Sequence, residues 1–565
     1  MANGCADSIE FRNARILDGT GSEPVSAHVL VENGRIARID DEPGGGNDVI
    51  DLNGSFLAPG FIDMHSHSDL RLFEKPGAVE KITQGITTEV LGQDGVSVAP
   101  VAPQHKDEWA SRIQALNGTI EEPWPWGTTV EYLDELADAE PAVNCASYAP
   151  HGNLRSLVVG FDDRSLSEPA PSTDPGSKTG HGSGPEDLEL LDVVRRELDR
   201  AIDHGAFGLS TGMIYPPSSY ASDDELLAFA ETLAARNAPM ISHVWNETDH
   251  VLESIDRYLD ICRRGGCQAH ISHLKVGGRD NWGQSTDVRT LLDQAEDRGQ
   301  RISFDQYPYT AGSTMLTAVL PPWARRGDSS DILDRLRDET ARARIAADIS
   351  KPGKWENFAR AAGSWDNVLI TRTASGQHEG ETVETIATER RSDPIEAICD
   401  LLVEEALDVT MATFIMSERD VERFMTDPRG TFCTDGIFGG KPHPRAIATF
   451  PRLIERYVGD KGVLSPELLA YKAAGRPADI LGLPDRGYVA EGYVADLVVF
   501  DLETVTERAT YDDPWQLTDS LEYVLVGGEI AVEDGTPTGL RNGTVLRSTD
   551  EWDGPNRPTL SRSAV

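Results

Sequence analysis

The chain has 565 residues, 39% of them hydrophobic, which is enough for one large folded domain and one or two smaller ones. Its 94 acidic residues outnumber the 52 basic ones and give a formal net charge of −42. Such a charge repels phosphates and argues against nucleic acid or anionic membranes as partners. Because the acidic residues are spread along the whole chain, we interpret the charge as halophilic adaptation to high salt rather than as recognition of a cationic ligand.

No apolar run approaches the length of a membrane span, and the first residues lack the pattern of a secretory signal. The six cysteines include no CxxC pair and have the spacing of reduced structural thiols. We therefore expect a cytoplasmic protein without a disulfide framework.

Both ends of the chain have strand patterns. Near the N-terminus, Val29–Ile36 contains the hairpin signal Asn33-Gly34. Near the C-terminus, Ala495–Asp501 and Tyr523–Gly528 have the same character. We expect residues 1–56 and 481–548 to form one small β-sandwich together, followed by a tail at residues 549–565.

The middle of the chain, residues 57–480, alternates strand-like runs with helix-like patterns such as Glu186–His204. Repeated strand-then-helix units predict parallel pairing, and their number favours an α/β fold of the TIM-like (β/α)8 barrel type. Insertions are expected near residues 165–186, which are rich in Pro, Ser and Gly, and near 314–365, which are strongly charged. The candidate strands are Thr87–Leu91, Val143–Tyr148, Gly208–Thr211, Met240–His243, Gln268–His273, Ile302–Asp305, Val368–Thr371 and Gly430–Thr434.

A His-x-His motif stands at the end of the first predicted barrel strand. Side chains alternate faces along a strand, so His65 and His67 point the same way, toward the barrel mouth where active sites lie. Two later strands also end in histidine, at His243 and His273. A single strand-end histidine is more often structural, but four in phase favour a metal site. Asp435, at the end of another strand, has the position of a further ligand or of a proton acceptor.

The sequence resembles the D-aminoacylase (N-acyl-D-amino-acid deacylase) family of the amidohydrolase superfamily. Besides the His65–His67 motif, the resemblance rests on several stretches spread from about residue 10 to about residue 548. These are Gln84–Thr88, Gly205–Pro217, Ile271–Lys275, Tyr307–Thr314, Pro442–Arg445 and Pro477–Leu483.

The resemblance implies roles for particular residues. His65 and His67 would hold one metal position, His243 and His273 the tighter one, with one or two Zn2+ ions bound. Asp435 would be the general base. The substrate carboxylate would be bound by Lys275, Tyr307 and Arg445, while Tyr215 and Ser313 would line the pocket. His151 is interpreted as a structural residue near the site.

One position departs from the family pattern. Where relatives often carry a bridging cysteine after the second strand, this chain has Asp94. A carboxylate can also bridge two metal ions, so we include Asp94 among the metal ligands; the structural alternative is a turn residue before Gly95.

The expected reaction is zinc-dependent hydrolysis of the amide bond of small N-acyl-D-amino acids, releasing a carboxylate and a D-amino acid. The alternatives are a cyclic amidase of the dihydroorotase or hydantoinase type, a dipeptidase of the same superfamily, or a non-catalytic ligand-binding relative. The expected fourth strand, Phe207–Tyr215, contains no Lys, which disfavours the cyclic amidase and the dipeptidase, because such relatives bridge their metals with a carboxylated lysine there. The complete set of candidate ligands disfavours a non-catalytic relative. Acyl-group preference and oligomeric state stay open.

Overall fold

The computed structural model describes residues 8–120, 123–164, 166 and 185–548. The predicted loop at 165–186 and the tail at 549–565 therefore lie almost entirely, and Cys5 wholly, outside the described residues. Within those ranges no helix is long and apolar enough to cross a membrane. The other cysteines are buried free thiols: Cys145, Cys262, Cys267, Cys399 and Cys433.

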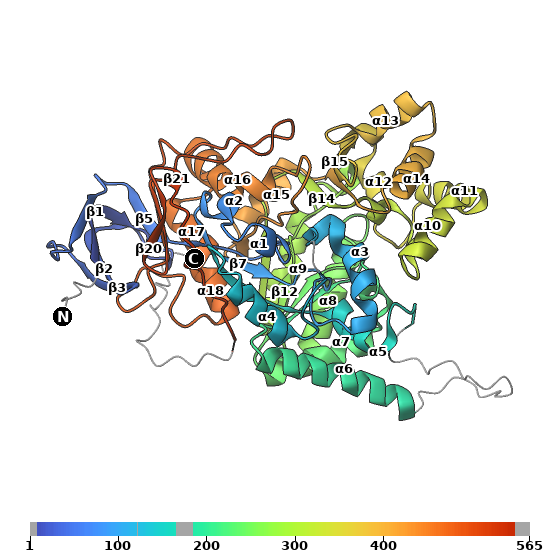
Figure 1. Cartoon of the computed structure of the whole chain (residues 1–565), viewed down its shortest axis with the longest axis horizontal. Coiled ribbons are helices and arrows are strands. Elements are labelled where there is room, and N and C mark those ends of the chain that lie inside the picture. Colours follow the sequence, from blue (N-terminus) through green and yellow to red (C-terminus); the bar gives the residue numbers. More distant parts are fainter. Residues whose placement is uncertain (1–7, 121–122, 165, 167–184, 549–565) are drawn as a thin grey trace.

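Strands from both ends of the chain form one mixed sheet beside the barrel (Figure 1). The C-terminal strand β18 pairs antiparallel with β5, with Leu497 opposite Pro59, so the two ends meet in one β layer as predicted. The strands of this sheet are β1 (Ser8–Ile16), β2 (Val25–Glu32), β3 (Arg35–Asp40), β4 (Asp48–Asp51), β5 (Phe56–Pro59), β18 (Leu497–Phe500), β19 (Tyr523–Val526), β20 (Glu529–Glu533) and β21 (Thr536–Pro537).

A closed parallel barrel follows, which confirms the TIM-like fold. Its strands, in order around the barrel, are β6 (Phe61–Asp63), β7 (Ile86–Leu91), β8 (Asn144–Ser147) continued by β9 (Ala149–Pro150), β10 (Leu209–Gly212), β11 (Pro239–His243), β12 (Gln268–Ile271), β13 (Ile302–Gln306) and β17 (Gly430–Phe432). The ring closes where the Met64 amide donates to the Phe432 carbonyl at 3.3 Å and Ser66 pairs with Gly436.

Helices cover the outside of the barrel, and their sequences explain their limits. In α8, the buried residues Ile255, Tyr258, Leu259 and Cys262 recur at helical spacing, and the helix ends at Gly266, whose φ of 82° suits glycine. The described helices of the barrel are α1 (Arg71–Glu74), α2 (Val79–Ile82), α3 (Lys106–Asn117), α4 (Thr129–Asp138), α5 (His151–Val159), α6 (Pro185–Asp203), α7 (Asp223–Ala235), α8 (Val251–Gly265), α9 (Ser285–Asp297), α15 (Glu418–Met425), α16 (Arg445–Arg452), α17 (Pro466–Ala470) and α18 (Arg476–Leu481).

One predicted barrel strand is wrong. Val368–Thr371 belongs to β15 (Val368–Thr373), which pairs antiparallel with β16 (Val409–Phe414) in a separate sheet that also contains β14 (Ala311–Met315). This sheet lies in a long excursion between β13 and β17, so its strands cannot enter the parallel ring. The helices of the excursion are α10 (Ser329–Arg337), α11 (Glu339–Ile349), α12 (Phe358–Ala362), α13 (Val383–Arg390) and α14 (Pro394–Glu404).

The terminal sheet is joined rigidly to the barrel. Only Gly60 separates β5 from β6, and a Cβ atom at Gly60 would lie 2.3 Å from the Thr87 side chain. Phe61 stacks on Phe450 with ring centroids 4.8 Å apart and lies 6.4 Å from Phe500 of the sheet. The first barrel strand thus starts from a fixed point in the shared core.

Candidate metal centre and active-site pocket

The six candidate ligands converge at the carboxyl ends of the barrel strands, where barrel active sites lie. His65 and His67 follow β6, Asp94 follows β7, His243 ends β11, His273 follows β12 and Asp435 follows β17. All six side chains are buried. The structure therefore brings together every metal ligand proposed from the sequence.

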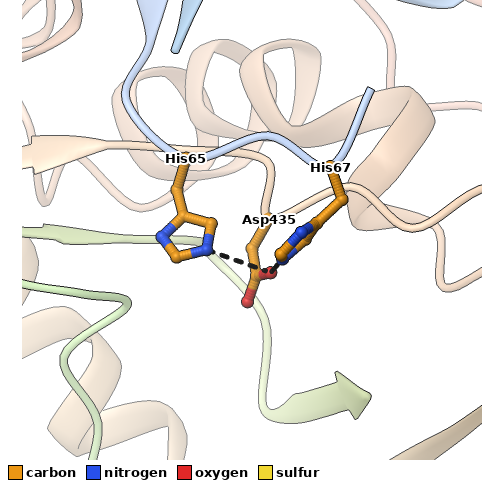
Figure 2. Close-up of side chains that lie close together, drawn as sticks. All are labelled: His65, His67 and Asp435. Carbon is orange, nitrogen blue, oxygen red and sulfur yellow. Dashed lines mark ion pairs between the residues drawn. The ribbon is translucent and has the colours of Figure 1, made fainter. Parts of the chain in front are cut away.

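His65 and His67 face Asp435 across the barrel mouth (Figure 2). The Nε2 atoms of the two histidines lie 3.8 Å and 3.4 Å from the same carboxylate oxygen, Oδ1 of Asp435. On the other side, His243 Nδ1 lies 3.1 Å from His273 Nε2. His65 and His67 thus form one pair beside Asp435, and His243 and His273 form a second pair with ring nitrogens in contact.

Asp94 lies between the two pairs. Its Oδ2 atom is 3.7 Å from Nε2 of both His65 and His67, and its Oδ1 atom is 3.5 Å from Nε2 of His273. One carboxylate thus faces both histidine pairs with different oxygens. Asp94 therefore has the position that a bridging ligand would need.

The residues fit a zinc ion. Ligand atoms about 2.0–2.1 Å from tetrahedral zinc are roughly 3.3 Å apart, and the distances above agree with that spacing. Both ring nitrogens of His65, Nδ1 of His67 and Oδ1 of Asp94 are buried without a hydrogen-bond partner among the described residues. Buried polar atoms are normally paired, so a bound cation would account for the two unpaired atoms that face the ligand cluster, Nε2 of His65 and Oδ1 of Asp94.

Three of the candidate ligands have a left-handed backbone conformation. The φ angles are 55° for Asp94, 35° for His273 and 47° for Asp435. Non-glycine residues rarely adopt such angles, which cost about 1–3 kcal/mol each and cluster at functional sites. Each angle turns the chain at the point where a strand has just ended, so the side chain is directed into the barrel mouth.

Lys275 shares the pocket with the metal ligands but is paired with an acid. Its Nζ atom contacts both carboxylate oxygens of Glu247 at 2.8 Å and Nδ1 of His273 at 2.7 Å. Burial opposes the charge on Glu247, yet Lys275 and the two histidines lower the pKa of Glu247 to about 2. Glu247 therefore stays ionised and holds Lys275 beside the metal centre.

Arg445 is buried against the proposed base. Its Nη2 atom lies 3.0 Å from Oδ2 of Asp435 and donates to the Ser313 carbonyl at 3.0 Å, and its guanidinium carbon lies 4.3 Å from the Tyr307 ring centroid. Burial alone would raise the pKa of Asp435, but Arg445 and His65 hold it well below its ordinary value. Asp435 therefore stays ionised in this arrangement.

A pocket of about 400 Å³ opens onto these groups. Tyr215, Tyr307, Ser313 and Lys275 all line it, as the sequence predicted for substrate-binding residues. The Tyr215 ring lies 5.3 Å from the His243 ring, and its hydroxyl is 2.8 Å from the Thr314 hydroxyl. Arg445 lies behind the wall formed by Tyr307 and Asp435.

Sequence reasoning missed three acidic residues. Glu247 contacts Lys275 and His273, as described above. Asp305 receives hydrogen bonds from the His270 ring and the His273 amide at 2.7 Å, and lies 3.9 Å from Nδ1 of His65. Glu356 accepts from the Glu247 amide at 2.7 Å and lies 3.4 Å from His243. Of the three, only Asp305 could have been found from the sequence, because it lies at the end of the predicted strand Ile302–Asp305.

His151 lies away from the metal centre. Its ring contacts Thr211 at 2.8 Å and Glu225 at 3.0 Å in a buried network. Burial lowers the pKa of His151, so the neutral ring serves as a link between β10 and α7.

A barrel that carries four histidines and two aspartates at its mouth defines a metal-dependent hydrolase of the amidohydrolase class. The sequence model of the Amidohydrolase family matches residues 48–532. The chain is 32% identical to an N-acyl-D-glutamate deacylase of Alcaligenes xylosoxydans xylosoxydans, over 94% of this chain and 95% of the relative. It is also 32% identical to the N-acyl-D-aspartate deacylase of that organism, over 95% and 94% of the two chains.

Among solved structures, the N-acyl-D-glutamate deacylase of Bordetella bronchiseptica, with zinc and a phosphonate mimic of the tetrahedral intermediate, is 30% identical. It matches with a TM-score of 0.78 over 96% of this chain and 99% of the other. The chain belongs to the D-aminoacylase, or N-acyl-D-amino-acid deacylase, family of amidohydrolases.

Proposed function

We propose that this protein hydrolyses the amide bond of N-acyl-D-amino acids with one or two zinc ions. The observation that carries the proposal is the convergence of six buried candidate ligands at the barrel mouth, of which His67, Asp94, His243, His273 and Asp435 line the pocket together with Lys275 and Tyr307, and His65 lies beside Asp94 and Asp435. Zinc bound there would polarise the amide carbonyl and acidify the attacking water.

Asp435 has the position and charge to act as general base. As an ionised carboxylate it accepts a proton from the attacking water and then returns the proton to the nitrogen of the leaving amino acid. Arg445, 3.0 Å from Oδ2 of Asp435, holds this carboxylate in place and favours its ionised form.

Lys275, Tyr307 and Arg445 are proposed to bind the free carboxylate of the substrate. Arg445 supplies a fork of donors, and its Nε and Nη1 atoms have no hydrogen-bond partner among the described residues. Preference for the D-configuration is supported by the relatives, which act on N-acyl-D-glutamate and N-acyl-D-aspartate by name. The cyclic-amidase alternative has weaker support, because the dihydroorotase relatives are only 23% identical over 60% of this chain.

The test is a panel of N-acetyl-D- and N-acetyl-L-amino acids incubated with the zinc-loaded protein in high salt, with amine release as the readout. The expected result is turnover of D-substrates only. A non-catalytic relative would bind zinc and release no amine. Release of amine from L-substrates at an equal rate would contradict the proposed stereochemistry while leaving the amidohydrolase chemistry intact.

A further inference from the structure

A second cavity adjoins the candidate active site. It spans about 640 Å³, a volume that includes space open to solvent, and is lined mainly by apolar side chains, among them Trp109, Ile113, Met315, Ala318, Ile332 and Leu407. Helix α3 packs against α10 (Figure 1), and residues of both helices line the cavity. An apolar cavity beside a catalytic pocket is a natural place for a part of the substrate away from the reacting bond.

The same elements line both cavities. Tyr215 lines both, and its hydrogen bond to Thr314 lies at their boundary. Along α3, Leu116 lines the active-site pocket and Ile113, one turn earlier, lines the second cavity. Along β14, Thr314 lines the first and Met315 the second. The two cavities therefore follow one another along a continuous wall.

One buried cation lines the apolar cavity. Arg325 is 7% exposed, its Nη1 atom donates to the Ile214 carbonyl at 3.1 Å, and its Nε atom is buried without a partner. No carboxylate among the described residues lies within ion-pair distance of it. The other arginine of the cavity, Arg112, is already paired with Glu108 at 2.6 Å.

An unpaired guanidinium in an apolar wall is costly unless it has an anionic partner. The charge of Glu356 acts on Arg325, but this carboxylate already accepts a hydrogen bond from the Glu247 amide. The carbonyl of Ile214 satisfies only one of the five donors of Arg325. The buried Nε donor, which has no partner among the described residues, is available to an anionic group that enters the cavity.

We propose that this cavity binds a second carboxylate of the substrate, carried at the end of an apolar chain, and that Arg325 pairs with that carboxylate. The inference rests on the proposed function and narrows it to dianionic substrates. The second carboxylate has two possible sources, the acyl group or the amino-acid side chain, and both present the same chemistry to Arg325.

The test compares two matched pairs of substrates. N-acetyl-D-2-aminoadipate and N-acetyl-D-norleucine differ in a carboxylate on the side chain, whereas N-glutaryl-D-leucine and N-pentanoyl-D-leucine differ in one on the acyl group. The wild-type protein is expected to prefer the dianionic member of one pair at least tenfold in kcat/KM, and that pair identifies the source. Arg325→Gln is expected to remove this preference by raising KM for the dianion.

The control is Arg326→Gln, which removes an exposed arginine paired with Asp163 and is expected to leave the preference unchanged. Arg325→Lys keeps the charge without the fork and is expected to lose only part of the preference. If Arg325→Gln does not fold, as judged by circular dichroism, the comparison of Arg325→Lys with wild type decides the test.

Three results would overturn the proposal: a wild-type protein that does not discriminate within either pair, an equal loss for both members of a pair in Arg325→Gln, or an unchanged preference in that variant. The second result would leave Arg325 as a support for the Ile214 carbonyl. If no member of the panel is hydrolysed, the proposed function fails. Dissociation constants of the same four compounds, measured by calorimetry on wild type and Arg325→Gln, then test the cavity independently.

Discussion

Replacing Asp94 with alanine is expected to weaken metal binding by at least about a thousandfold. The carboxylate is buried and lies 3.5–3.7 Å from three imidazole nitrogens that would share the ion with it. At an effective dielectric constant near 20, two unit charges about 4 Å apart interact by about 4 kcal/mol. That energy corresponds to roughly three orders of magnitude in affinity, and a divalent ion loses more.

Two further substitutions distinguish the effect of the Asp94 charge on zinc binding from the effect of its volume. Asp94→Asn keeps the volume and an oxygen ligand but removes the charge, so it is expected to bind zinc nearly as weakly as Asp94→Ala. Asp94→Cys supplies a thiolate and is expected to retain zinc and measurable turnover. Because the backbone at Asp94 has a φ of 55°, which Asp tolerates better than most residues, the cysteine variant is also expected to melt at a lower temperature.

The assay is competition for zinc with a chelator of known affinity, with elemental analysis and amine release measured on the same samples. Melting curves of the metal-free proteins show whether each variant folds. An Asp94→Ala protein that keeps its zinc at the wild-type affinity and turns over normally would refute the bridging role and leave Asp94 as a turn residue.

Asp435→Asn, assayed at saturating zinc, is expected to lose about 10²–10⁴ in kcat, because an amide cannot accept the proton; a rate within threefold of wild type would exclude Asp435 as the base. Arg445→Lys is expected to raise KM for N-acyl amino acids far more than it lowers kcat, and equal effects on substrate amides without the free carboxylate would contradict that assignment. With 42 more acidic than basic residues, folding and activity are expected to require molar salt, so an equal melting temperature in about 0.1 M and 2 M KCl would refute the halophilic interpretation. Burial lowers the pKa of Lys472 from its ordinary 10.5 to about 7. The unfolded chain then binds one more proton than the folded chain between these values, and stability gains up to about 1.4 kcal/mol per pH unit as pH rises. Lys472→Met is expected to lose this slope in urea titrations, and an identical slope in both proteins would argue against the shift.

The sequence predicted the parts of the site that repeat a local pattern. His65, His67, His243 and His273 follow strand-like runs, and parallel strands necessarily bring such positions to one end of a barrel. The position of Asp94 came from the resemblance to a family rather than from its own pattern. The local pattern shows at which end of the barrel a residue lies. It does not show which other residues that residue contacts.

The remaining features depend on contacts between distant segments. Glu356 reaches His243 from the excursion between β13 and β17, 113 residues away in the sequence. Val368–Thr371 is an apolar run like any barrel strand, and only the chain path that returns it antiparallel to β16 distinguishes it. The pairing of Arg445 with Asp435 likewise follows from packing after β17 and has no counterpart in residue spacing.

The pairing of β5 with β18 also has a consequence for synthesis of the protein. Strand β5 ends at Pro59, and its antiparallel partner begins at Leu497, roughly 440 residues later. At about 5–20 residues per second, β5 leaves the ribosome about 20–90 s before that partner exists. During this interval the edge of β5 that later pairs with β18 is unpaired and open to other chains.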